Sequence, residues 1–158
     1  MKLIRNIITI SLSVFILSTA LFAQEGHNHG TMKAEAEMKE AFGTVPVMFK
    51  VYPEHMRASA WEWFKSTGSP ESDIPAKYVQ LISLGVASQI PCDYCVYAHT
   101  TQAKMHGATE EEIQTAVVAA AETRHWSTVL NGADVNIEDF RAEWDGILEH
   151  IKKQSEGQ

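Results

Sequence analysis

Apolar residues recur at intervals of three and four along most of this chain, which is the spacing of one buried face on an α-helix. The stretch from Ile74 to Gln89 shows this most clearly, because Val79, Ile82 and Val86 follow one another at these intervals. No stretch alternates apolar and polar residues convincingly, as a half-buried strand would. The pattern therefore predicts an all-α protein, and no internal repeat is evident.

Helix-breaking and capping residues divide the pattern into about six helices. We expect them over residues 32–42, 47–65, 74–89, 91–106, 113–130 and 137–153. Pro53 should kink or restart the second helix, and Pro91 should stand in the first turn of the fourth. Thr109 to Glu112 has the form of a capping box, and Asn131-Gly132 is expected to end the fifth helix.

The fifth predicted helix has a small, apolar centre from Ala116 to Ala121. Small residues allow two helices to approach closely, and a helix that is apolar on all sides is normally buried. In a domain of this size, contacts between subunits are a natural source of that burial. We therefore expect a homo-oligomer that assembles through its helices.

The N-terminus has the pattern of a secretory signal peptide, with a basic start followed by an apolar run from Ile7 to Ala20. That run of about 15 residues is short for a membrane-spanning helix, which needs ~20, although a retained anchor is the alternative. We expect a signal peptide over 1–23, a flexible lead over 24–31 and one helical domain over 32–154. The mature protein would then be periplasmic or secreted.

The net charge and the expected export limit the partners and the cysteine chemistry that the protein can have. Removing Lys2 and Arg5 with the signal peptide takes the formal charge from −7 to −9, and no basic cluster remains, so a nucleic-acid partner is not expected. Export implies an oxidising compartment, in which a cysteine pair becomes a disulfide by default. His27 and His29 in the lead offer two metal ligands, but a solvated tail is the favoured interpretation because little nearby completes a site.

The chain has two cysteines, and they lie three residues apart in Pro91-Cys92-Asp93-Tyr94-Cys95-Val96-Tyr97-Ala98-His99. On a helix, Cys92, Cys95 and His99 share one face, and Cys92 lies near the N-terminus, where the helix dipole favours a thiolate. This arrangement suggests that Cys95 attacks a peroxide and becomes a sulfenic acid. Cys92 would then close the disulfide, and His99 would hold or relay the proton.

Three other interpretations compete with a redox pair. A purely structural disulfide would close a loop of four residues, worth roughly 2 kcal/mol against ~3 for a 15-residue loop. A zinc site would have three ligands in Cys92, Cys95 and His99, but there is no other cysteine to supply the fourth ligand, and oxidation would compete with it. Haem attachment needs a histidine directly after the second cysteine, and Val96 stands there instead.

The chain from about residue 45 to 131 resembles the AhpD-like (alkylhydroperoxidase D-like) group of the carboxymuconolactone decarboxylase superfamily. The matching stretches are residues 74–87, 92–99 and 106–113. The resemblance implies an all-helical fold that forms trimers or larger oligomers, and a thiol peroxidase that acts on hydroperoxides without haem, metal or another cofactor. It implies that Cys95 is the peroxidatic residue, that Cys92 is the resolving residue and that His99 belongs to a proton relay.

Two features depart from the pattern of that group. Its members usually carry a glutamate twelve residues before the first cysteine as the base of the relay, and this chain has Gln80, whose amide cannot accept a proton. General-base help is worth about 10²–10⁴ in rate. Glu122 and His125 are candidates to replace that base, although each is also expected as an ordinary polar residue of its helix. The signal peptide is the second departure, because the lipoyl-bearing reductants of cytoplasmic members would be out of reach.

The sequence therefore predicts an exported thiol-dependent hydroperoxidase. Its partners would be a hydroperoxide substrate and an unidentified thiol reductant, such as a thioredoxin-like protein. A thiol–disulfide oxidoreductase without peroxide turnover is one alternative, and a non-enzymatic metal-binding module is the other.

Overall fold

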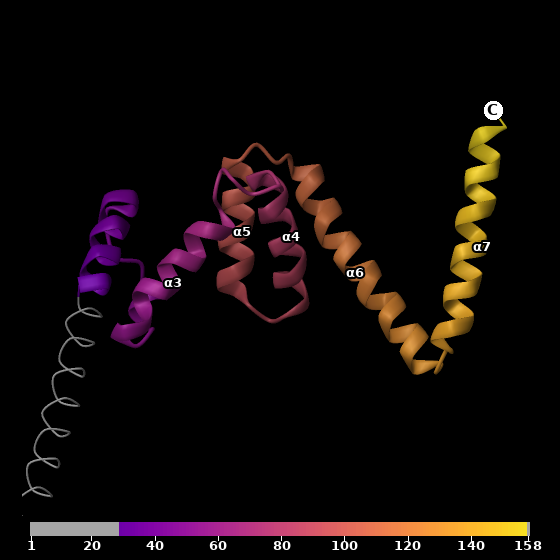
Figure 1. Cartoon of the computed structure of the whole chain (residues 1–158), viewed down its shortest axis with the longest axis horizontal. Coiled ribbons are helices and arrows are strands. Elements are labelled where there is room, and N and C mark those ends of the chain that lie inside the picture. The colour runs from indigo at the N-terminus through magenta and orange to yellow at the C-terminus, as the bar shows by residue number, and fades with distance from the viewer. Residues whose placement is uncertain (1–28, 158) are drawn as a thin grey trace, which may run out of the picture. The chain divides into compact units, whose positions relative to one another are not determined.

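The computed structural model describes residues 29–157, which are helical apart from short connecting segments and contain no strand. The all-α prediction is thus confirmed for this part of the chain. The predicted signal peptide and residues 24–28 lie outside it. The structure forms two units, one ending at Ser72 and one starting at Asp73, and each is described by itself (Figure 1). The predicted limits of 32–154 for a single domain stay a prediction.

Within residues 29–157, none of the helices combines the length and apolar character that a bilayer crossing requires.

The first unit holds a helix at residues 29–42, α2 at Val47–Lys50 and α3 at Glu54–Thr67. Pro53 is the N-cap of α3, so the chain restarts its helix there, which is one of the two outcomes predicted for this proline. Residues 29–31 are helical although a flexible lead was predicted. Thr31 is buried, and its hydroxyl donates a hydrogen bond of 3.0 Å to the carbonyl of Glu54.

Aromatic rings form the core of the first unit. Phe49 and Trp61 are buried, with ring centroids 5.7 Å apart in an edge-to-face arrangement. Trp61, and not Trp63, faces this core. Trp63 is 72% exposed, whereas Trp61 is 4% exposed.

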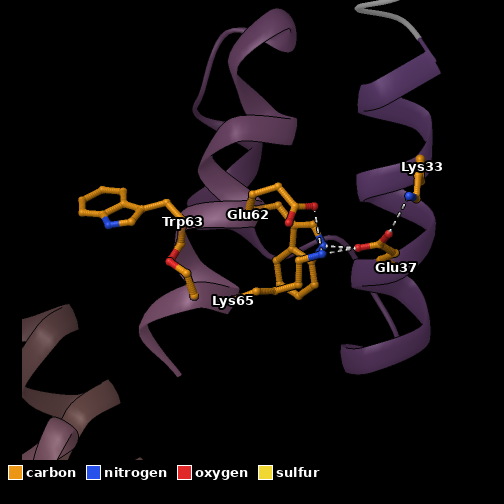
Figure 2. A network of polar contacts seen from close by, with 7 residues as sticks. Lys33, Glu37, Glu62, Trp63 and Lys65 are labelled. Carbon is orange, nitrogen blue, oxygen red and sulfur yellow. Dashed lines mark hydrogen bonds and ion pairs between the residues drawn. The ribbon is translucent and has the colours of Figure 1, made fainter. Parts of the chain in front are cut away.

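An ion-pair network joins the helix at 29–42 to α3. Lys65 lies 2.7 Å from the carboxylate of Glu37 and 2.9 Å from that of Glu62, whereas Trp63 points away from the network (Figure 2). The indole N–H of Trp61 also donates to Glu37, at 2.7 Å. These bonds, that from Lys65 first, lower the pKa of Glu37, so the carboxylate stays ionised and fixes the buried indole.

The second unit contains α4 at Ala76–Gln89, α5 at Asp93–Met105, α6 at Glu110–Gly132 and α7 at Ile137–Glu156. α4 packs against both α5 and α6, and the core between them contains Leu84, Ala103 and Ile113. A Cβ placed on Gly85 of α4 would lie 3.5 Å from the Cβ of Ala120 on α6. The small residues of α6 thus allow the close helix approach that the sequence predicted.

The start of α6 lies where the sequence predicts it, whereas its end lies beyond the predicted one. Thr109 and Glu112 form the predicted capping box, with bonds of 3.2 and 2.9 Å in the two directions. Asn131 and Gly132 do not end the helix, because both stay helical and the Asn131 amide donates to the carbonyl of Ser127. Asp134 supplies the left-handed residue instead, with φ of 51°.

Burial along α6 is one-sided in the single chain. Ile113 is buried, but Val118 is 65% exposed in the single chain. The physical reason is that α4 and α5 cover one side of α6, the side that carries Ile113 and Val117. α7 has no buried residue, and its large apolar residues other than Phe140, including Trp144 and Leu148, are exposed.

Candidate redox site

The chain turns from α4 into α5 through an extended residue and a proline. Ile90 has φ of −112° and ψ of 134°, as expected for a residue that precedes Pro91, and α4 ends there. Pro91 was predicted in the first turn of the next helix, but α5 begins at Asp93 with Cys92 as its N-cap. The reason is local, because the sulfur of Cys92 accepts the backbone N–H of Cys95 at 3.3 Å. Cys92 thereby takes the place that serine or aspartate usually fills.

Cys92 and Cys95 are joined by a disulfide, with their Cα atoms 5.3 Å apart. That separation lies in the usual range for such a bond. Both residues are half-buried, so the bond is not sealed inside the protein core. The spacing of the two cysteines in the sequence thus correctly predicted a pair within bonding reach at the start of a helix.

His99 lies one turn after Cys95 on α5 and contacts α4. Its Nδ1 atom is 2.8 Å from Oε1 of Gln80, a residue 19 positions earlier in the chain. His99 is half-buried, and burial lowers its pKa from the ordinary value of 6.5. The structure therefore brings together four of the predicted site residues, in two contacts: Cys92 with Cys95, and His99 with Gln80.

The remaining relay candidates lie on α6. Glu122 and His125 are both exposed, and the ring of His125 meets that of Trp126 with centroids 5.2 Å apart. Neither side chain is hydrogen-bonded to the cysteine pair or to His99. In the single chain, Gln80 is thus the candidate that touches the histidine.

An ion pair near the site went unnoticed in the sequence. Lys77, one turn before Gln80 on α4, lies 2.7 Å from the carboxylate of Glu112 on α6. This hydrogen bond raises the pKa of Lys77 and lowers that of Glu112, so both stay charged and hold α4 against the start of α6. In the sequence, the pair is visible only as two oppositely charged residues, each near the start of its helix. Such residues are too common to predict an ion pair.

Two tyrosines beside the disulfide were also not singled out. Tyr94 stands between the cysteines and Tyr97 follows one turn later, and both are exposed. Across residues 29–157, no three histidine, cysteine or acidic side chains are grouped to hold a metal ion.

Comparison with known proteins places this site in a family. The model of the carboxymuconolactone decarboxylase family matches residues 52–135, which is more than half of the chain. The chain belongs to the carboxymuconolactone decarboxylase family. The matched region contains Gln80, both cysteines and His99, so the candidate site lies inside the family domain. The superfamily predicted from the sequence, which contains the AhpD-like proteins, is confirmed.

The chain is also similar to one curated protein over part of its length. An uncharacterized protein of Cupriavidus necator is 36% identical over 55 residues, which is 35% of this chain and 49% of that protein. The chain thus spans about half the length of the relative it matches. No solved structure matches the chain significantly.

Proposed function

We propose that this member of the carboxymuconolactone decarboxylase family is a thiol-dependent hydroperoxidase that cycles Cys92 and Cys95 between dithiol and disulfide. The observation that carries the proposal is the Cys92–Cys95 disulfide at the N-terminus of α5, with His99 one turn further along the same helix. A bond that closes so short a loop contributes only roughly 2 kcal/mol, so a structural purpose alone explains it poorly.

The cycle balances with a hydroperoxide as oxidant and a dithiol as reductant. The Cys95 thiolate attacks the hydroperoxide, a sulfur–oxygen bond forms, the oxygen–oxygen bond breaks, and the leaving alkoxide takes a proton to become an alcohol. The Cys92 thiol then attacks the sulfenic acid, which forms the disulfide and releases water. An external dithiol returns two electrons by exchange and becomes a disulfide itself.

The fold supplies a reason for each residue's role in this cycle. The backbone N–H groups at the start of α5 stabilise a thiolate, because the positive end of the helix dipole lies there. His99 has a lowered pKa, so it is neutral near pH 7 and able to accept a proton from a thiol. We propose that the cycle runs outside the cytoplasm after export, with a thioredoxin-like protein as the reductant.

A second candidate is a thiol–disulfide oxidoreductase that exchanges with protein partners and ignores peroxide. The contact between His99 and Gln80 favours this alternative, because an amide is no general base. The exposed rings of Tyr94 and Tyr97 beside the disulfide would suit contact with a protein substrate.

One assay separates the two candidates. The purified protein with a dithiol donor should consume an organic hydroperoxide, and Cys95→Ser should abolish this consumption. Cys92→Ser should leave a sulfenic acid that dimedone labels, detected by mass spectrometry. His99→Gln should slow turnover by about 10²-fold or more, whereas His106→Gln, on the exposed C-cap of the same helix, should not.

The outcomes are distinct. Consumption that survives in Cys95→Ser would refute the assigned role of that residue. If the wild-type protein consumes no hydroperoxide with any dithiol donor but reduces insulin disulfides, the peroxidase proposal fails and the oxidoreductase stands.

A further inference from the structure

The contact between His99 and Gln80 fixes where the imidazole carries its hydrogen. Nδ1 of His99 lies 2.8 Å from Oε1 of Gln80, and an amide oxygen accepts hydrogen bonds but cannot donate them. Nδ1 must therefore be the protonated nitrogen. A neutral imidazole has one N–H, so Nε2 is left with the free lone pair.

The surroundings of the ring also keep it neutral. Gln80 carries no charge, so it does not stabilise an imidazolium as a carboxylate at the same distance would. Burial lowers the pKa of His99, and among residues 29–157 no charged neighbour contributes to that shift. The lysines on the two helices that meet here are already paired, Lys77 with Glu112 at 2.7 Å and Lys104 with Glu110 at 2.8 Å. Asp93 lies in the first turn of α5, six residues before His99.

We propose that Gln80 is a positioning residue that holds His99 as its neutral Nδ1–H tautomer in the disulfide form, so that Nε2 is free to accept a proton at the redox site. This inference rests on the redox function proposed above, because it assigns how that site handles its proton. Gln80 acts through His99 and does not itself exchange a proton.

The consequence falls on the reduced form of the site. Reduction by an external dithiol gives two thiols, and an imidazole that starts out neutral supplies no standing positive charge to stabilise a thiolate. A couple whose reduced form lacks such stabilisation is less oxidising than one whose thiolate is held by a positive charge. The site should therefore hold its disulfide firmly and need a strongly reducing dithiol partner.

The test introduces the missing charge. In the wild-type disulfide form, ¹⁵N NMR of His99 near neutral pH should show a protonated Nδ1 and an unprotonated Nε2. Gln80→Glu should convert this pattern to that of an imidazolium. In the reduced protein, alkylation of the cysteines by iodoacetamide at mildly acidic pH should then rise at least about tenfold, because a nearby positive charge lowers a thiol pKa by about one unit or more.

A matched control shows whether the new charge must lie beside His99 to have an effect. Gln114→Glu makes the same change on the exposed surface of α6 and should alter neither readout. Gln80→Leu removes the acceptor without adding charge and should abolish the single tautomer.

Two results would overturn the proposal: a wild-type spectrum with the hydrogen on Nε2, or a Gln80→Glu protein whose spectrum and alkylation rate match the wild type. The wild-type spectrum decides the tautomer even if a variant fails to fold. Neither measurement needs peroxide turnover. A protein with the expected spectrum but no hydroperoxide consumption would therefore refute the peroxidase and leave the role of Gln80 standing.

Discussion

Cys92 combines two roles that are usually given to different residues. Its sulfur accepts the N–H of Cys95 as the N-cap of α5, and the same sulfur forms the disulfide. A sulfur in this place stays near the positive end of the helix dipole in both redox states. The sequence predicted this placement from the cysteine spacing and Pro91. It could not predict that Cys92 itself caps the helix, because that depends on a side-chain contact formed only in the fold.

His99 should make stability depend on pH. Burial lowers its folded-state pKa below the ordinary 6.5, so below that pH the unfolded chain binds a proton that the folded protein resists. The free energy of unfolding should therefore fall as pH decreases from about 6.5 until the folded-state pKa is reached. In His99→Gln this part of the decrease should be missing, as measured by urea unfolding of the disulfide form at several pH values.

The exposed His106 provides the control for that measurement. His106→Gln should retain the wild-type decrease. Equal pH profiles for wild type and His99→Gln would contradict the buried, neutral state of His99.

At the level of the helix, the contact between α4 and α6 depends on small residues. A Cβ on Gly85 would lie 3.5 Å from the Cβ of Ala120 and 3.7 Å from the carbonyl oxygen of Ala116, which is ordinary van der Waals contact. One methyl group thus fits, but a longer side chain does not. The contact is tight enough that the size of a single residue sets the distance between the two helices.

This geometry predicts opposite effects for two substitutions at one position. Gly85→Ala should stabilise the protein by roughly 0.5–1 kcal/mol, because alanine is the better helix former. Gly85→Leu should destabilise it by about 1–3 kcal/mol, because the added atoms overpack the contact. Urea unfolding would measure both.

Gly146 on α7 has no neighbour within 4 Å of a Cβ, so Gly146→Leu isolates the effect of helix propensity and should not destabilise. A destabilising Gly85→Ala would show that α4 and α6 lie closer than described.

Helix starts could be predicted where a proline or a capping box marks them, and helix ends were harder to predict. Pro53 and the Thr109–Glu112 capping box mark starts of α3 and α6 because each acts on the backbone within one turn. The end of α6 was misplaced because Asn131 and Gly132 are compatible with a helix when the true turn lies at Asp134.

For the whole molecule, exposed apolar surface on α6 and α7 is the main unexplained feature. Val118 and Trp126 on α6, and Trp144, Leu148 and Ile151 on α7, are all exposed in the single chain. Solvent contact with so many large apolar side chains is unfavourable, and such surfaces commonly mark protein interfaces. The small, apolar centre of α6 predicts subunits that meet through helices, and we propose that α6 and α7 supply the contact.

A charge placed in that surface should break the assembly. The wild-type protein should sediment as a multimer, and Leu148→Glu should sediment as a smaller species, because an interface does not accept an unpaired carboxylate. Ala142→Glu adds the same charge at an exposed position on the opposite side of α7 and should leave the multimer intact. A monomeric wild type in sedimentation velocity would end this proposal.

One carboxylate ties several of these features together. Glu112 closes the capping box that starts α6, and it also binds Lys77, one turn before Gln80 on α4. Replacing Glu112 would therefore do two things at once, since it removes the side chain that caps the start of α6 and also the ion pair from α6 to α4, the helix that carries Gln80. A residue that bonds to neither sulfur atom thus links the start of α6 to the helix that contacts His99.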